Sequence, residues 1–158
     1  VIRKAVDMGV RAATHVGNGL HKTIHRFQNP IWPILAEDRL HGLFITDGCH
    51  LPVDMIKVCL RAKDPSKFIV TSDMVHYAGM SPGTYTYHDG PVVLERNGYL
   101  HREGSEQLAG STATMTDCMD FLASLGELNA RGLKQVGRDN PLALLNEKFT
   151  NLLHEKRT

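Results

Sequence analysis

Three short apolar runs of the sequence each end in a histidine or an aspartate. The runs and the side chains that follow them are 10–14 with His15, 40–46 with Asp47 and His50, and 68–71 with Asp73. A neutral imidazole such as that of His15 could bind zinc or iron. An aspartate close to such a metal can take a proton from an activated water molecule and pass it to a leaving amine. Asp73 is therefore the candidate acid and base.

The loop after the first run has features of a phosphate site. The backbone N–H groups of the glycine-bearing turn at 17–19 could hold an anion, and the Arg26 guanidinium suits two-point phosphate recognition. His50 could polarise a carbonyl or hold a sugar hydroxyl.

Each of these side chains also has a purely structural interpretation. His15 could be a hydrogen-bonded structural histidine, and Arg26 could simply be solvated. Asp47 could merely cap its turn, as most Asp-Gly pairs do, and Asp73 could cap the turn that follows it. The recurrence of such groups after every run is what favours a site.

The spacing between the runs indicates the elements that position these groups. The three runs predict strands, and helical patterns at 31–36 and from Pro52 onward lie between them, which indicates parallel βα units. In a (β/α)₈ barrel the chemistry lies at the carboxyl ends of the strands. We therefore expect an α/β fold that forms the C-terminal part of a TIM-type (β/α)₈ hydrolase barrel.

The second half of the chain has a different pattern. Asn97-Gly98 between extended segments predicts an antiparallel β-hairpin region over about 83–102. Apolar residues at helical spacing predict a helix from Thr114, and Pro141 is expected to start a last helix through Leu145. Residues 147–158 are expected to form a polar tail.

Composition limits the class of protein. The chain has 158 residues, 42% of them hydrophobic, and a formal net charge of +1, so nucleic acid and anionic membranes are not expected as partners. No apolar stretch approaches the ~20 residues that span a bilayer. Cys49, Cys59 and Cys118 are widely spaced, so they are expected to be free packing residues in a reducing cytoplasm.

The motifs occur in the order found in N-acetylglucosamine-6-phosphate deacetylases of the amidohydrolase superfamily, which residues 1–146 resemble. These motifs are Thr14-His15-Val16-Gly17-Asn18-Gly19, Arg26, Asp47-Gly48-Cys49-His50, Thr71-Ser72-Asp73-Met74 and Leu108-Ala109-Gly110-Ser111. The sequence departs from the family pattern at Gly17, where an aromatic residue is usual, at Gly19, where alanine is usual, and at Ser72, which precedes the aspartate here.

The resemblance implies an activity and a role for each matched residue. It implies hydrolysis of the N-acetyl group of a phosphorylated amino sugar, with zinc or iron as cofactor, in a cytoplasmic homo-oligomer. The implied roles are metal ligation by His15, acid–base catalysis by Asp73, and substrate binding by Asn18, Gly19, Arg26, His50, Leu108, Ala109 and Gly110.

The family's remaining metal ligands would lie before Val1, so this chain is expected to be inactive alone.

Two other functions stay open at this point. The first alternative is an amidohydrolase for a different amino sugar or a cyclic amide. The second is a non-catalytic fragment that serves as an interaction module.

Overall fold

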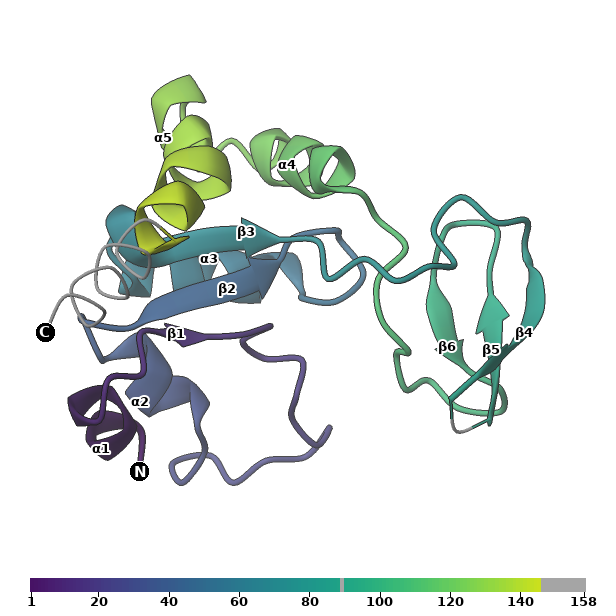
Figure 1. Cartoon of the computed structure of the whole chain (residues 1–158), viewed down its shortest axis with the longest axis horizontal. Coiled ribbons are helices and arrows are strands. Elements are labelled where there is room, and N and C mark those ends of the chain that lie inside the picture. Colours follow the sequence, from purple (N-terminus) through teal and green to yellow (C-terminus); the bar gives the residue numbers. More distant parts are fainter. Residues whose placement is uncertain (89, 146–158) are drawn as a thin grey trace, which may run out of the picture.

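The protein contains two small β-sheets, one parallel and one antiparallel, joined by two extended segments (Figure 1). The structure is a computed structural model that describes residues 1–88 and 90–145. Most of the helices surround the parallel sheet, and the antiparallel sheet projects from one end of it (Figure 1). The predicted α/β class is therefore confirmed.

The parallel sheet contains β1 (Ala12–Ala13), β2 (His41–Ile45) and β3 (Phe68–Thr71), in the order β1-β2-β3. The strands predicted at 40–46 and 68–71 are confirmed. The strand predicted at 10–14 is shorter, because β1 pairs with β2 along two residues only. β2 and β3 are buried almost throughout, as expected for parallel strands covered on both faces.

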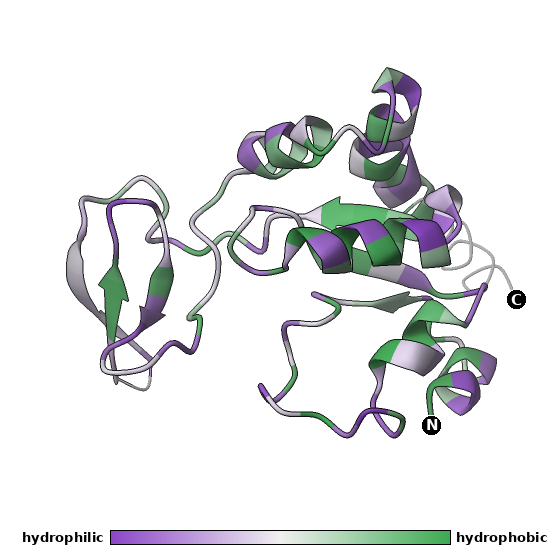
Figure 2. Ribbon diagram, turned by 180° about the vertical axis from the view of Figure 1, so that it is seen from behind, coloured by the Kyte–Doolittle hydropathy of each residue, from purple (hydrophilic) through white to green (hydrophobic). Residues whose placement is uncertain are grey.

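Helices cover the parallel sheet and complete its core. They are α1 (Ile2–Asp7), α2 (Ile31–Leu35), α3 (Val53–Ala62), the 3₁₀ turn η1 (Pro65–Lys67), α4 (Met115–Ser124), α5 (Ala130–Lys134) and the π-helical segment η2 (Gln135–Asp139). Figure 2 shows α3 lying across one face of the sheet, with apolar residues along its length. The rings of Phe44 and Phe68 stack at 4.2 Å between centroids in the core.

The antiparallel sheet contains β4 (Gly83–Tyr87), β5 (Gly90–Leu94) and β6 (Leu100–Arg102). The predicted hairpin region at about 83–102 thus forms three strands. The turn at Asn97-Gly98 is present: Gly98 has φ 84°, and its N–H donates to the Glu95 carbonyl. This sheet has its own small core of Tyr77, Val92, Leu94, Leu100 and Ala109.

The end of the described chain differs from the prediction. Pro141 does not start a helix, because the helix that begins at Ala130 continues through η2 into 140–145. Proline lacks the N–H of an α-helical hydrogen bond and crowds the preceding turn. The π-helical segment η2, which ends two residues before Pro141, provides a register change that accommodates it. The predicted tail at 147–158 lies outside the described residues.

The expectation that all three cysteines are packing residues is corrected at one position. Cys59 and Cys118 are buried packing residues, but Cys49 is exposed on the turn after β2. His41 is buried at 4% exposure in β2. Among the described residues, no helix is long and apolar enough to cross a membrane.

Candidate active site

A pocket of about 170 Å³ lies at the carboxyl ends of the three parallel strands. It is lined by His15, Asn18, Ile45, His50, Asp73, Leu108 and Gly110. Six of the nine predicted site residues therefore share one pocket. A larger hollow of about 550 Å³ beside α1 and α2 contains none of them. Typical ligand pockets have volumes of ~300–1,000 Å³, so this pocket is smaller than a typical ligand site.

His15 and Asp73 share an unusual backbone conformation. In the described part of the chain they are the only residues other than glycine with positive φ, at 31° and 49°. Each follows its strand by two residues, which turns the backbone sharply at the sheet edge. Such conformations cost on the order of 1–3 kcal/mol and are concentrated at functional sites. The strain therefore marks these two of the predicted residues independently of their chemistry.

Asn18 links the turn after β1 to the turn after β2. Its side-chain amide donates to the His50 carbonyl at 2.9 Å. Its Oδ1 and the Nδ1 of His15 are buried, and neither has a hydrogen-bond partner among the described residues. Buried polar atoms are nearly always satisfied, so two unpartnered atoms in one site indicate a polar or cationic ligand.

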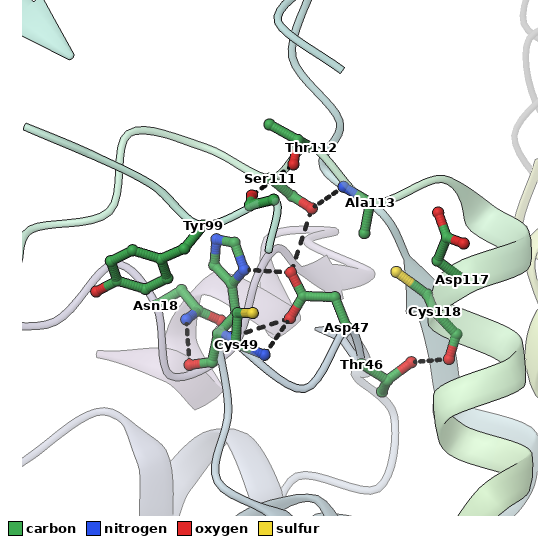
Figure 3. Close-up of polar contacts among 12 residues, drawn as sticks. Asn18, Thr46, Asp47, Cys49, Tyr99, Ser111, Thr112, Ala113, Asp117 and Cys118 are labelled. Carbon is green, nitrogen blue, oxygen red and sulfur yellow. Dashed lines mark hydrogen bonds and ion pairs between the residues drawn. The ribbon is translucent and has the colours of Figure 1, made fainter. Parts of the chain in front are cut away.

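Asp47 accepts hydrogen bonds from the turn after β2 and from Ser111 (Figure 3). Its Oδ1 accepts from the backbone N–H groups of Cys49 and His50, each at 2.9 Å. Its Oδ2 lies 2.7 Å from Nδ1 of His50 and accepts from the Ser111 hydroxyl at 3.3 Å. The side chains of Asp47 and His50 are each only 5% exposed. Asp47 thus caps the turn, as one interpretation predicted, but it also contacts a pocket residue.

The hydrogen bonds to Asp47 keep its carboxyl group ionised. Burial alone raises its pKa, but hydrogen bonds from the His50 ring and from the N–H groups of His50 and Cys49 outweigh this effect and lower the pKa to about 2. Hydrogen bonds to the charged form of an acid favour that form. Asp47 is therefore a carboxylate at neutral pH, and it faces a ring nitrogen of His50.

The segment at 108–110 returns from the antiparallel sheet and closes one side of the pocket. Leu108 and Gly110 line it, whereas the Ala109 side chain points into the core of the antiparallel sheet. Side chains along an extended segment alternate between its two sides. Gly110 has φ 102°, and a Cβ there would lie 2.5 Å from Cγ1 of Val75. Close packing of this wall thus requires glycine.

Arg26 and Gly19 do not line the pocket. Arg26 is exposed in the 21–30 loop, where its guanidinium lies 5.4 Å from the centre of the Phe27 ring. Gly19 lies directly beside the site, since a Cβ added there would come within 3.1 Å of Cε1 of His15.

The departure from the family pattern at Gly17 has a packing explanation. Gly17 has φ 98°, and a Cβ there would lie 2.8 Å from Cε of Met55 and 2.9 Å from Cδ2 of Leu51. Side chains of the following βα unit occupy the space that a larger residue at 17 would need.

The described residues provide one suitable metal ligand but not a complete metal site. Nδ1 of His15 is buried and has no hydrogen-bond partner among the described residues, which suits a histidine whose ring binds a ligand. No group of three or more His, Cys, Asp or Glu residues within 1–88 and 90–145 could hold a metal ion. A protein metal site generally needs at least three protein ligands, so His15 fits a divalent metal only together with other donors.

Comparisons with known proteins agree with the family resemblance that the order of the motifs indicates. No family model matches the chain. It is 27% identical over 128 residues to the N-acetylgalactosamine-6-phosphate deacetylase of Shewanella sp. strain ANA-3. The aligned residues cover 81% of this chain and 32% of that relative. It is 27% identical over 150 residues to the N-acetylglucosamine-6-phosphate deacetylase of Lysinibacillus sphaericus, covering 95% of this chain and 38% of the relative. The chain thus spans about a third of the length of these curated relatives.

Solved structures of the same kind of enzyme have a similar fold. The N-acetylglucosamine-6-phosphate deacetylase of Thermotoga maritima superposes with a TM-score of 0.82 at 26% identity, covering 93% of this chain and 40% of that one. The enzyme of Mycobacterium smegmatis, solved in complex with N-acetyl-D-glucosamine-6-phosphate, gives a TM-score of 0.81 at 22% identity, covering 91% of this chain and 39% of that one. The resemblance to N-acetylglucosamine-6-phosphate deacetylases, expected from the motifs, is confirmed.

Sequence reasoning missed two residues of this site. Asp47 was counted among the groups that end the strands but was given no role beyond a possible turn cap, and Ser111 was noted only as the end of a motif. The spacing of Asp47 and His50 at i and i+3 could have indicated their contact, because a turn brings such residues together. The contact between Ser111 and Asp47 spans 64 residues and has no local signal in the sequence.

Proposed function

We propose that the chain forms the C-terminal part of the active site of a metal-dependent deacetylase. The reaction is hydrolysis of the N-acetyl group of N-acetylglucosamine-6-phosphate to glucosamine-6-phosphate and acetate. In this proposal β1, β2 and β3 belong to a (β/α)₈ barrel, and residues 147–158 are a tail. The observation that carries the proposal is the pocket in which His15, Asn18, His50 and Asp73 meet at the carboxyl ends of parallel strands.

The pocket residues divide the chemistry between them. His15 would hold a divalent cation, zinc or iron, with ligands from outside the described residues. Such a cation would supply an activated water molecule and polarise the acetyl carbonyl. Asp73 takes a proton from the water molecule while the water oxygen adds to the carbonyl carbon. Asp73 then gives that proton to the amine nitrogen as the C–N bond breaks.

The remaining residues bind and orient the sugar. His50 contacts the substrate through the ring nitrogen that Asp47 does not occupy. Asn18 with Gly19, and Arg26, hold the phosphate, and the wall at 108–110 lies against the sugar. Binding energy from the phosphate, remote from the reacting bond, orients the acetamide. Since Arg26 is exposed and outside the pocket, its role requires the 21–30 loop or a neighbouring subunit to bring it to the phosphate.

A second substrate is favoured by one observation. A relative named N-acetylgalactosamine-6-phosphate deacetylase matches this chain at the same 27% identity as one named for the glucosamine compound. The two sugars differ only in the configuration of one hydroxyl. Acetate release from both compounds, compared by kcat/KM, decides between them.

The proposal is tested with the protein as its gene encodes it, including any residues that precede Val1. Asp73→Asn keeps the side-chain size but cannot transfer a proton, so kcat should fall by roughly 10²–10⁴-fold while metal content and KM change little. Arg26→Ala should raise KM for the phosphorylated sugar and leave hydrolysis of the non-phosphorylated sugar unchanged. Asp120→Asn on α4 and Arg96→Ala in the turn before β6, both exposed, are matched controls. The same modest loss in all four variants would show that Asp73 and Arg26 have no specific role.

A further inference from the structure

We propose that Asp47 is a positioning residue for His50: it fixes the neutral ring as the Nδ1–H tautomer and directs Nε2 to the substrate. The importance of this tautomer for turnover rests on the proposed function. The tautomer itself is a property of the chain and can be measured without any substrate.

The hydrogen-bond arrangement determines which ring nitrogen carries the proton. Asp47 is a carboxylate and accepts at both oxygens. An ionised carboxylate has no proton to donate, so the 2.7 Å contact requires that Nδ1 of His50 carries the hydrogen. Among the described residues no side chain or backbone group bonds Nε2 of His50, and His50 lines the pocket. Nε2 is therefore the ring nitrogen that can meet a ligand.

The tautomer limits what His50 can do to a substrate. In the neutral ring Nε2 has a lone pair and accepts a hydrogen bond from a hydroxyl. In the protonated ring Nε2–H donates to an anionic oxygen, and Asp47 stabilises the positive charge. The hydrogen-bond partner of Nδ1 determines whether Nε2 of the neutral ring accepts or donates.

Ser111 connects this pair to the segment that follows the 108–110 wall. Its hydroxyl donates to Oδ2 of Asp47 at 3.3 Å and accepts from the Ala113 N–H at 3.0 Å (Figure 3). Ser111 is 1% exposed, and its backbone bridges to Met74, next to Asp73. Asp47 thus has four hydrogen-bond donors, two from its own turn, one from His50 and one from the segment that follows Gly110.

Asp47→Asn separates positioning from turn capping. Asparagine caps such turns about as well as aspartate, so its Oδ1 can keep both backbone N–H groups. Its NH₂ group then faces Nδ1 of His50 and donates to it, which forces the ring into the Nε2–H tautomer. A residue that served only as a cap would leave the tautomer unchanged.

The test is ¹⁵N NMR of histidine-labelled protein, followed through a pH titration to the neutral ring. The His50 signals are assigned by their loss in His50→Gln. We expect Nδ1–H in the native protein and Nε2–H in Asp47→Asn, with Nδ1–H retained in the control Asp117→Asn, a capping residue of α4 that does not touch His50. An Nε2–H tautomer in the native protein, or an unchanged tautomer in Asp47→Asn, overturns the inference. The native measurement needs no variant to fold.

Turnover then tests the positioning role in the protein as its gene encodes it. Loss of the partner that orients a metal-ligating histidine typically costs about 10–100-fold. We expect a similar factor for His50, so kcat/KM should fall by that factor in Asp47→Asn and stay unchanged in Asp117→Asn. A tautomer switch with unchanged kcat/KM refutes the positioning role. If the native protein hydrolyses neither N-acetylhexosamine phosphate, the proposed function fails, while the tautomer result still decides whether Asp47 controls His50.

Discussion

Acid should remove the stabilising contribution of Asp47, and Asp47→Asn should abolish this part of the pH dependence. Hydrogen bonds from His50 and Cys49 lower the pKa of Asp47 from its ordinary value of 3.8 to about 2. A carboxyl group with a lowered pKa in the folded state stabilises the fold above its unfolded pKa. The contribution is lost as the pH falls through the folded pKa.

The magnitude follows from the difference between the two pKa values. One pKa unit corresponds to about 1.4 kcal/mol, so Asp47 should contribute about 2–3 kcal/mol at neutral pH. The loss should begin near pH 5 and be nearly complete near pH 2. The Asp47 side chain is only 5% exposed, so solvent screening reduces this value little.

Urea denaturation of the native chain and Asp47→Asn over this pH range provides the measurement. The two proteins should differ by about 2–3 kcal/mol at neutral pH and converge in acid. Other carboxyl groups with lowered pKa values, such as Glu37 beside Arg39 and Asp139 beside Lys134, titrate in both proteins and cancel in the difference. A stability difference that stays constant with pH would refute the assigned hydrogen bonds of Asp47.

Three further outcomes are expected. Gly48→Ala should destabilise the chain by about 1–2 kcal/mol because of its positive φ. It should lose about 1–3 kcal/mol more because the new Cβ would lie 2.6 Å from Cε2 of Phe121. Gly79→Ala has nearly the same φ but open space around it, so thermal unfolding should show only the backbone cost in that variant. Gly19→Ala should shift the NMR signals of the His15 ring, because the new Cβ would lie 3.1 Å from its Cε1, whereas Gly83→Ala, with no contact nearer than 4.0 Å, should leave them unchanged. The 158-residue chain should retain no stoichiometric zinc or iron after dialysis and should not hydrolyse N-acetylglucosamine-6-phosphate, since one imidazole is not a metal site; elemental analysis with near one equivalent of metal would contradict this.

Sequence reasoning located the parallel sheet because its strands depend on local pattern. The runs at 40–46 and 68–71 are mostly apolar, as expected for buried parallel strands. Groups that follow such strands must share one sheet edge, so the meeting of His15, His50 and Asp73 follows from the strand pattern alone. The hairpin region was located through Asn97-Gly98, whose turn geometry is also local.

The errors of prediction arise where distant contacts override local preference. Pro141 indicated a helix start, but the π-helical turn before it allows the helix to continue, and no local pattern announces that turn. The Ala109 side chain points into the second core because its segment pairs with β6, and no local pattern indicates that pairing. Ser111 reaches Asp47 across 64 residues, and only the folded chain makes that contact.

The physical features of the pocket favour a ligand-binding role over a purely structural one. Burying Nδ1 of His15 and Oδ1 of Asn18 without partners costs stability, and the positive φ of His15 and Asp73 adds strain. A site that served only stability would relieve these costs, for example with glycine at both strained positions. The costs instead coincide at the carboxyl ends of two strands, around the cavity that His50 and the 108–110 wall also face. A bound cation and a polar substrate would satisfy the unpartnered atoms, so the energetic defects of the chain lie where a ligand would offset them.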